Sequence, residues 1–573
     1  MRITYNDKLN KLLNPYLESL LKEKSSLEPE TLTLFDLFME DLDMGGRYGI
    51  FSEILEPRLE EIIREENIES IANLMDGRLN TLFRYMLGDE FAGLFHTYLQ
   101  LEARCPHTIG YDRRAQRSAH PSNHLDHARD AWLQFLKLRA TGFSVEAILK
   151  GGNTPEDTEE FSGYMNSSYW LAAQIAQGNE KVIEYLNQVL TSENNVHRLQ
   201  RWYLHAIAIS GHRPLLELEG KLLLAAKLQE GLRQAIVETM DEGCPESYLY
   251  LFSIIYNNGL QRFASVKRSI AVCTGIGEQD SSERITNKYV ELIWNFLNHP
   301  ETARNTLQSK DTVELYLALW SIGFYDTDEI RAIVPDIIRK GAKHQIQTLL
   351  YFLRCTQSSQ MNHLISKDAF EVWHDDPKVV AAILPLYMDG LYLSRYSDNK
   401  EAPTLSDYFE TPEEAVRHYG YLKQVYQSIS AKEIYSPYVF PWDCVVLTRS
   451  DVVLKMAYIA WMTNDIRLRE ELCTYLPALE SYNRASYIGI VLPRTESKVE
   501  QEYVLQSLGD RSADIRDEAY KVLSEMSLSP EQYQHIEELL RFKYSEMRIN
   551  AINLLMKQPE AQLAASIRRL LSD

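Results

Sequence analysis

Apolar residues recur at three- and four-residue spacing along most of this chain, which is the spacing of one face of an α-helix. The pattern is clearest in four segments, residues 91–103, 129–140, 287–297 and 348–355. A hydroxyl residue followed by proline, which is typical of a helix start, occurs at Thr154-Pro155, Thr411-Pro412 and Ser529-Pro530. Because runs of alternating β-branched residues bounded by tight turns are missing, we expect little or no sheet. The pattern predicts an all-α fold.

A sequence repeat stands out near the end of the chain, where residues 507–526 return as residues 539–558 at an offset of 32. The equivalent positions are Leu508 and Leu540, Ile515 and Met547, Arg516 and Arg548, and Ala519 and Ala551. Small alanines let neighbouring helices approach closely, and the arginine can tie one repeat to the next through carboxylates or carbonyls. These residues resemble HEAT repeats over about residues 500–573. The resemblance implies stacked helical hairpins, an α-solenoid of the HEAT/ARM type.

The segments upstream have the character of helical hairpins without this repeat signature. We therefore predict an α-solenoid that is irregular in its N-terminal part, or a separate N-terminal all-α domain followed by a short repeat module. The predicted regions are an N-terminal helical region that ends in a basic, histidine-rich loop (1–122), an irregular array of helical hairpins (123–390), an insertion rich in aromatic residues and proline (391–450), and HEAT-like repeats (451–573).

Charge and cysteine usage narrow the class of protein. A formal net charge of −21 argues against general affinity for nucleic acid or anionic membrane, because both are polyanions. The six cysteines are scattered without a CxxC pair, which predicts reduced, buried thiols. The N-terminus lacks the apolar region of a signal peptide, and the longest apolar run, residues 379–388, is about half a membrane span. We expect a soluble cytoplasmic protein with no membrane partner.

The last predicted helix, residues 561–573, keeps apolar residues where a terminal repeat normally carries a polar cap. These residues are Leu563, Ile567, Leu570 and Leu571. We therefore expect the native chain to continue into a further domain. In agreement with this expectation, the helical texture of the whole chain resembles the N-terminal region of large bacterial proteins related to the molybdate-regulator (MolR) group. That resemblance implies no particular chemistry.

The insertion at residues 391–450 is the predicted binding surface for a protein partner, because it is long, punctuated by proline and rich in aromatic residues. The candidate contact residues are Tyr408, Phe409, Tyr435, Tyr438, Phe440 and Trp442. The alternative is that these rings pack over the solenoid and bridge an irregular joint between repeats.

Four histidines within 21 positions, in a chain that has only 14, are the main candidates for chemistry. The ligands of a zinc site would be His107, His120, His124 and His127, with Cys105 as a further donor. An anion site at the N-terminus of a helix would instead use Arg113, Arg114, Arg117, His120 and Arg129. The third interpretation is structural. In that case Ser122 or Asn123 caps a helix whose buried face is formed by Trp132, Phe135 and Leu136.

Other signatures of catalysis are missing, since the chain has no GxxxxGK[ST], GxGxxG, GxSxG or HExxH motif. Glu371-x-x-His374 has the spacing of half a di-iron site, but no second such motif completes it. We therefore predict a non-enzymatic scaffold or protein-interaction module without a cofactor, as part of a larger bacterial protein. The alternatives are an anion- or nucleic-acid-binding solenoid that uses residues 104–129, and a metal-dependent enzyme centred on the same histidines.

Overall fold

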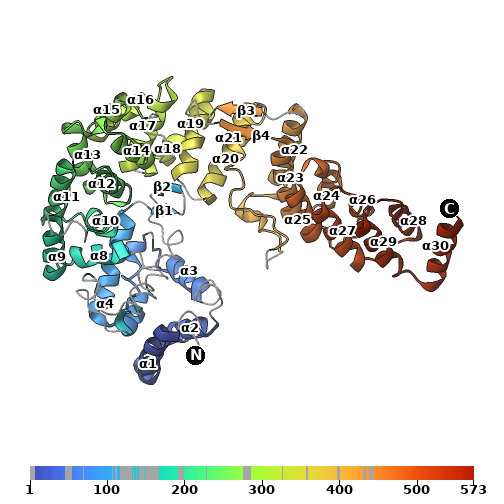
Figure 1. Cartoon of the computed structure of the whole chain (residues 1–573), viewed down its shortest axis with the longest axis horizontal. Coiled ribbons are helices and arrows are strands. Elements are labelled where there is room, and N and C mark those ends of the chain that lie inside the picture. The colour runs from blue at the N-terminus through green and yellow to red at the C-terminus, as the bar shows by residue number, and fades with distance from the viewer. Residues whose placement is uncertain are drawn as a thin grey trace. The chain divides into compact units, whose positions relative to one another are not determined.

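The computed structural model consists almost entirely of α-helices among the residues that it describes (Figure 1). The described residues are 7–44, 55–68, 70–105, 107–109, 112–116, 132, 135–136, 138–140, 149, 167–191, 199–226, 229–274, 285–325, 327–356, 359–396, 401–429, 434–437, 444–493 and 495–572. The chain divides into two compact units, residues 1–332 with 355–358 and residues 333–354 with 359–573. The prediction of an all-α fold is confirmed.

The first unit begins with α1 and also holds one hairpin of two short strands. Its helices are α1 (Asp7–Glu23), α2 (Pro29–Met44), α3 (Leu55–Glu65), α4 (Leu79–Arg104), α8 (Ser167–Ala176), α9 (Glu180–Thr191), α10 (Arg201–Ser210), α11 (Arg213–Ala225), α12 (Glu230–Glu242), α13 (Pro245–Asn257), α14 (Ala264–Cys273), α15 (Asn287–Asn298), α16 (Pro300–Thr306) and α17 (Thr312–Tyr325). The antiparallel strands are β1 (His107–Ile109) and β2 (Asp112–Gln116). Alternate helices pack together, with α8 on α10, α10 on α12, and α12 on α14.

The division between the units falls within α18 (Thr327–Lys340) and α19 (Lys343–Thr356). The helices of the second unit are α20 (Ser359–Trp373), α21 (Pro377–Ile383), α22 (Pro412–Ser428), α23 (Arg449–Thr463), α24 (Ile466–Leu472), α25 (Ser481–Val491), α26 (Lys498–Ser507), α27 (Ala513–Glu525), α28 (Pro530–Leu539), α29 (Ser545–Leu555) and α30 (Glu560–Ser572). Two antiparallel strands, β3 (Ile434–Pro437) and β4 (Cys444–Leu447), pack against α21.

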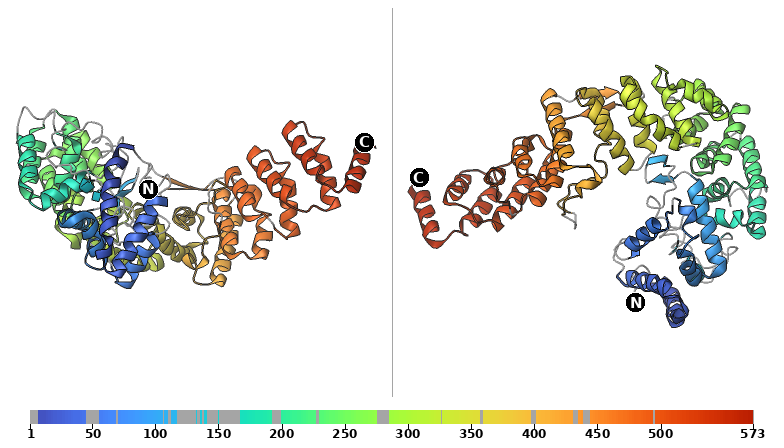
Figure 2. Two further views of the ribbon diagram at one scale, coloured as in Figure 1. Left: turned by 90° about the horizontal axis from the view of Figure 1, so that it is seen from below. Right: turned by 180° about the vertical axis from the view of Figure 1, so that it is seen from behind.

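Helices α23 to α30 form two layers within the second unit (Figure 2). Helices α23, α25, α27 and α29 pack on one another in one layer, and α24, α26, α28 and α30 pack on one another in the second layer. The apolar repeat positions lie between these helices, and Ile515, Ala519, Met547 and Ala551 are all buried. The predicted stacking of helical hairpins is therefore present, while the HEAT assignment itself stays a resemblance.

Two of the predicted helix starts are confirmed by their hydrogen bonds. Thr411 Oγ1 accepts a hydrogen bond from the backbone N–H of Glu414 at the start of α22. Ser529 and Gln532 form a reciprocal capping box at the start of α28. The third predicted start, Thr154, lies outside the described residues. Helix α22 lies within the predicted insertion at 391–450 and packs on α23, so this part of the insertion continues the helical stack.

The structure also bears on the expectations about cysteines and membrane-spanning segments. Four of the cysteines are described as free and buried, namely Cys105, Cys244, Cys273 and Cys473. In the part of the chain that the structure describes, every helix is too short or too polar to cross a lipid bilayer.

Candidate functional site

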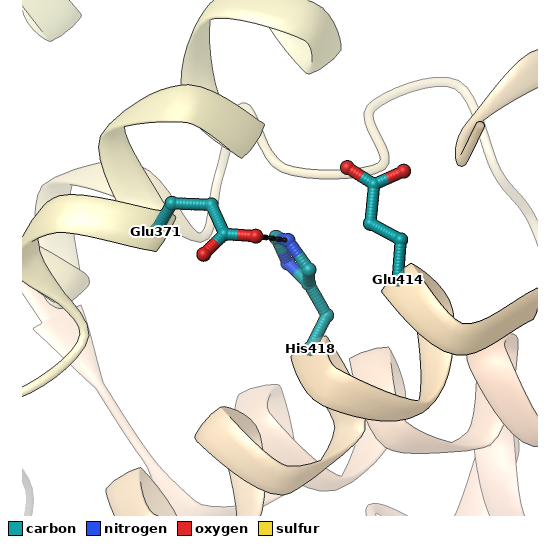
Figure 3. A group of neighbouring side chains, drawn as sticks. All are labelled: Glu371, Glu414 and His418. Carbon is teal, nitrogen blue, oxygen red and sulfur yellow. Dashed lines mark hydrogen bonds and ion pairs between the residues drawn. The ribbon is translucent and has the colours of Figure 1, made fainter. Parts of the chain in front are cut away.

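Helices α20 and α22 bring a glutamate and a histidine together inside the second unit (Figure 3). Because Thr411 caps α22, Glu414 falls in the first turn and His418 falls one turn later, so the two residues lie on the same face of the helix. Glu371 is near the end of α20 and points toward His418. Its Oε1 atom lies 3.0 Å from His418 Nε2.

A buried tyrosine extends this contact into a row of three polar groups. The Tyr387 hydroxyl lies 2.8 Å from His418 Nδ1, and neither side chain is exposed to solvent. Burial raises the pKa of Tyr387 well above its ordinary value, so the hydroxyl keeps its proton and donates a hydrogen bond to Nδ1. Burial also lowers the pKa of His418, although Glu371 opposes this effect. A neutral His418 therefore accepts from Tyr387 and donates its Nε2–H to Glu371.

Each carboxylate of this cluster has a positively charged partner. Glu371 Oε1 accepts a hydrogen bond from Arg417 Nη2 at 2.6 Å, and Glu414 Oε1 lies 3.0 Å from Lys367 Nζ. Burial tends to raise the pKa of both carboxyls, but hydrogen bonds from Arg417 and Lys367 contribute to a net lowering of both pKa values. Lys367 and Glu414 form an ion pair that is almost closed off from solvent, with side-chain exposures of 8% and 13%.

The same cluster has the donor set of a metal site. One atom from each of Glu371, Glu414 and His418 lies within 4.8 Å of the others, and two carboxylates with an imidazole suit zinc, manganese or iron. A divalent cation at this point would, however, meet Arg417 and Lys367, which already neutralise the two carboxylates. Repulsion between these positive charges opposes metal binding. The arrangement fits a structural network that joins α20 to α22.

The order hydroxyl, imidazole, carboxylate is also that of a catalytic nucleophile with its base and orienting acid. A nucleophile must be able to reach its substrate. Because the Tyr387 side chain has no exposed surface, its oxygen cannot meet a substrate in this structure. The row therefore positions helices and offers no accessible nucleophile.

A second buried histidine, His363, holds the turn that follows α21. Met388 has a φ of 53°, which is uncommon for a residue with a side chain, and its backbone N–H donates to His363 Nδ1 at 2.9 Å. His363 Nε2 therefore carries the proton and donates to the carbonyl oxygen of Tyr408 at 2.9 Å. Burial lowers the pKa of His363 to about 4, so the ring is neutral at pH 7. Both ring nitrogens of His363 are therefore hydrogen-bonded to backbone groups, which holds the turn in place.

The sequence pattern points to only part of this cluster. In the structure, Glu371 bonds to His418, while His374 stacks on Tyr421 with ring centroids 3.8 Å apart. The spacing of Glu371 and His374 thus does not reflect a shared metal. Part of the cluster could have been found from Glu414 and His418, because they are four residues apart after a predicted helix start and so share one helix face. Glu371 comes from a different helix, so no local spacing could have joined it to them.

The predicted metal and anion residues fall mostly outside the structure's described part. His107 lies in β1, and Arg113 and Arg114 lie in β2, where only the backbone is described. Outside the described residues are His120, His124, His127, Arg117 and Arg129. Both site assignments therefore stay predictions. The apolar residues expected on the buried face of the following helix, Trp132, Phe135 and Leu136, are buried.

The aromatic residues predicted to contact a partner are placed in part. Phe409 is 2% exposed, and its ring packs edge-on against His418. Tyr408 is half-buried and binds His363 through its carbonyl oxygen. Tyr435 lies in β3, where only the backbone is described. Outside the described residues are Tyr438, Phe440 and Trp442. The rings of Tyr408 and Phe409 both contact His363, and the role of the insertion as a partner-binding surface stays a prediction.

A different surface is apolar and exposed at the last helix pair of the second unit. On the α29 side, Ile549, Ile552 and Met556 are 56%, 49% and 64% exposed, and their spacing of three and four residues places them on one helix face. The exposed apolar residues on α30 are Ile567, Leu570 and Leu571. We refer to Ile549, Ile552 and Met556 of α29 as the terminal face.

The preceding helix shows how this kind of face is covered. Subtracting the repeat of 32 from Arg548, Ile552 and Met556 gives Arg516, Tyr520 and Ser524 on α27. There, Arg516 Nη2 donates to Glu546 of α29 at 2.9 Å, and Lys557 Nζ, just beyond α29, donates to the carbonyl oxygen of Ser524 at 2.6 Å. Arg516 and Ser524 of α27 are thus each contacted by the next repeat, whereas Arg548, Ile552 and Met556 of α29 are exposed among the described residues.

Comparison with known proteins identifies one family. No curated protein and no solved structure matches the chain. One family model matches residues 34–573, which is nearly the whole chain, and its description is a family of unknown function (DUF5724). The match does not test the resemblance to HEAT repeats or to the MolR group. The chain belongs to the DUF5724 family.

Proposed function

We propose that this chain is a protein-interaction module and that the terminal face is its contact surface. The observation that carries this proposal is the exposure of Ile549, Ile552 and Met556, three apolar residues on one face of α29. Apolar side chains exposed to water cost free energy, and where several share one face they commonly mark a contact with another macromolecule.

The polar cluster around His418 supports the same function. Its histidine and tyrosine side chains are fully buried, and its carboxylates are paired with Arg417 and Lys367. Residues with these contacts stabilise helix packing, and the Tyr387 hydroxyl and the His418 ring are closed off from solvent. An interaction role requires a rigid stack of helices, and the cluster supplies rigidity at the point where α22 joins that stack.

The experiment compares two single-residue variants of the full chain in cells of the source organism. Ile552→Asp places a charge in the terminal face, and Val499→Asp places the same charge at an exposed apolar position of α26. Proteins cross-linked to each variant are identified by mass spectrometry, and the binary complex is then rebuilt from purified components. We expect Ile552→Asp to weaken the complex by about 10- to 100-fold, as for a central interface residue.

The Val499→Asp variant measures how much a surface charge away from the terminal face changes binding. Val499→Asp should bind its partner within about twofold of the unaltered chain, since isolated surface substitutions change little. Recovery of the same partners with equal affinity by both variants would contradict the proposal.

A further inference from the structure

Two cysteines from distant parts of the first unit lie against the end of α10. Cys105, directly after α4, has its Sγ atom 3.8 Å from the carbonyl oxygen of Ile209. The backbone N–H of Cys244 donates to the carbonyl oxygen of Ala208 at 3.1 Å. Because Ala208 and Ile209 are neighbours in the last turn of α10, the two cysteines are anchored at adjacent carbonyl groups.

The side chain of Cys244 points toward the same helix end. Gly211, which follows α10, has a φ of 66°, and a Cβ at this position would lie only 3.0 Å from Cys244 Sγ. Glycine therefore leaves the space that the sulfur needs. Beside the thiols, Arg104 Nη2 donates to Glu246 Oε2 at 3.1 Å. This ion pair is a second contact between the backbone segments that carry the two cysteines.

Both thiols are enclosed, with 5% of Cys105 and none of Cys244 exposed. Burial raises the pKa of Cys105 well above its ordinary value, and the charge of a neighbouring Cys244 thiolate raises it further. Cys244 is the N-cap of α13, and its Sγ lies 3.2 Å from the Ser247 hydroxyl. Burial also raises the pKa of Cys244, but hydrogen bonds from Ser247 oppose this effect. Cys244 therefore has donors that stabilise its thiolate.

We propose that Cys105 and Cys244 are a redox-sensitive pair, which hydrogen peroxide oxidises to a reversible disulfide that ties the end of α4 to the start of α13. One sulfur attacks the peroxide, the O–O bond breaks, and a sulfenic acid and one water form. The second thiol then attacks that sulfur and displaces another water. Two thiols and one peroxide thus give one disulfide and two waters. The inference concerns the first unit and is independent of the terminal face.

The disulfide would change how the first unit opens. In the reduced protein, the end of α4 is held to α10 by packing and by the weak contact of the Cys105 thiol with Ile209. A covalent bond to Cys244 would prevent this end from separating while α13 stays in place. Oxidation should therefore slow hydrogen exchange in the last turn of α4, and reduction should restore the faster exchange.

The experiment uses the full chain, treated with hydrogen peroxide in its folded state. Remaining thiols are blocked with iodoacetamide, and the digest is mapped by mass spectrometry. We expect one peptide pair joined through Cys105 and Cys244, which reduced glutathione returns to thiols in the folded protein. In Cys105→Ala and Cys244→Ala the crosslink should be lost, and dimedone should capture the sulfenic acid of the remaining cysteine.

Cys273→Ala is the matched control. Cys273 is also 5% exposed, and its Sγ lies 3.9 Å from a helix carbonyl oxygen, that of Val237. This variant should form the same disulfide at the same rate as the unaltered chain, because burial and a carbonyl contact alone do not supply a second thiol.

Three outcomes would overturn the inference. Cys105 and Cys244 that both remain open to alkylation after peroxide treatment, or that crosslink only when the chain is oxidised in urea, would show that the fold does not bring the sulfurs together. A disulfide that reduced glutathione does not reopen would be structural and not redox-sensitive. Unchanged hydrogen exchange in α4 after complete oxidation would mean that the bond controls no opening of the first unit.

Discussion

The hydroxyl of Tyr387 and Nδ1 of His418 lie 2.8 Å apart in a part of the second unit that solvent does not reach. Tyr387→Phe removes the donor and leaves a buried nitrogen without a partner, which costs about 1–3 kcal/mol. We expect the free energy of unfolding to fall by this amount, measured by urea titration with circular dichroism. Tyr544→Phe, at a ring that is 67% exposed, is the control and should change stability by less than about 0.5 kcal/mol. Equal stability of the two variants would contradict the buried hydrogen bond.

His363 makes stability depend on pH below neutrality. Burial lowers its pKa from 6.5 to about 4, so the unfolded chain binds a proton that the folded chain does not. The stability that this neutral ring contributes is complete above pH 6.5 and is lost as the pH falls from 6.5 toward 4. We expect a loss of about 1.4 kcal/mol per pH unit once the unfolded histidine is protonated.

The measurement is a set of urea titrations across this window for the unaltered chain and for His363→Gln. Glutamine cannot titrate, so the slope of the free energy of unfolding against pH should decrease by about one proton. His418, whose pKa burial also lowers, keeps part of the dependence in both proteins. An unchanged slope in His363→Gln would show that another group is responsible.

Arg516 and Arg548 provide a matched pair, because they occupy equivalent positions in α27 and α29, which are neighbours in one layer. Arg516→Ala removes the bond to Glu546 and two bonds to carbonyl groups at a site that is 7% exposed. We expect a loss of about 1–3 kcal/mol, whereas Arg548→Ala should cost less than about 0.5 kcal/mol. Thermal unfolding of both variants checks this difference. Similar losses would mean that Arg548 also has a partner within the chain.

Divalent metal should not stabilise the cluster of Glu371, Glu414 and His418. Arg417 and Lys367 already neutralise its carboxylates, so a cation would have to displace them. We expect zinc or manganese at a few equivalents, and EDTA at equal concentration, to leave the melting temperature unchanged within about 1 °C. Lys367→Met serves as a comparison, since it removes one repelling charge. Metal-dependent stabilisation of the unaltered chain would establish a metal site here.

The helical fold could be predicted because its determinants are local. Thr411 and Ser529 predict helix starts because a proline follows each of them. Ile515 and Met547 indicate a repeat because they lie 32 residues apart. The cluster around His418 could not be predicted in the same way. Glu371 and His418 are separated by 47 residues, and their contact depends on how α20 and α22 pack. Likewise, the sequence gives no indication that Phe409 is buried while Met556 is exposed, because both are apolar residues beside a predicted helix.

The two-layer order of α23 to α30 has a consequence for how the stack loses its structure. A helix inside a layer packs on two neighbours of that layer, whereas among the described residues α29 and α30 each pack on one, α27 and α28. Hydrogen exchange should therefore be fastest in this last pair and slow progressively toward α23, as in other linear arrays. A ligand bound to α29 would slow exchange there first. It would also raise the energy needed to open α27, because α27 opens only after α29 has moved away.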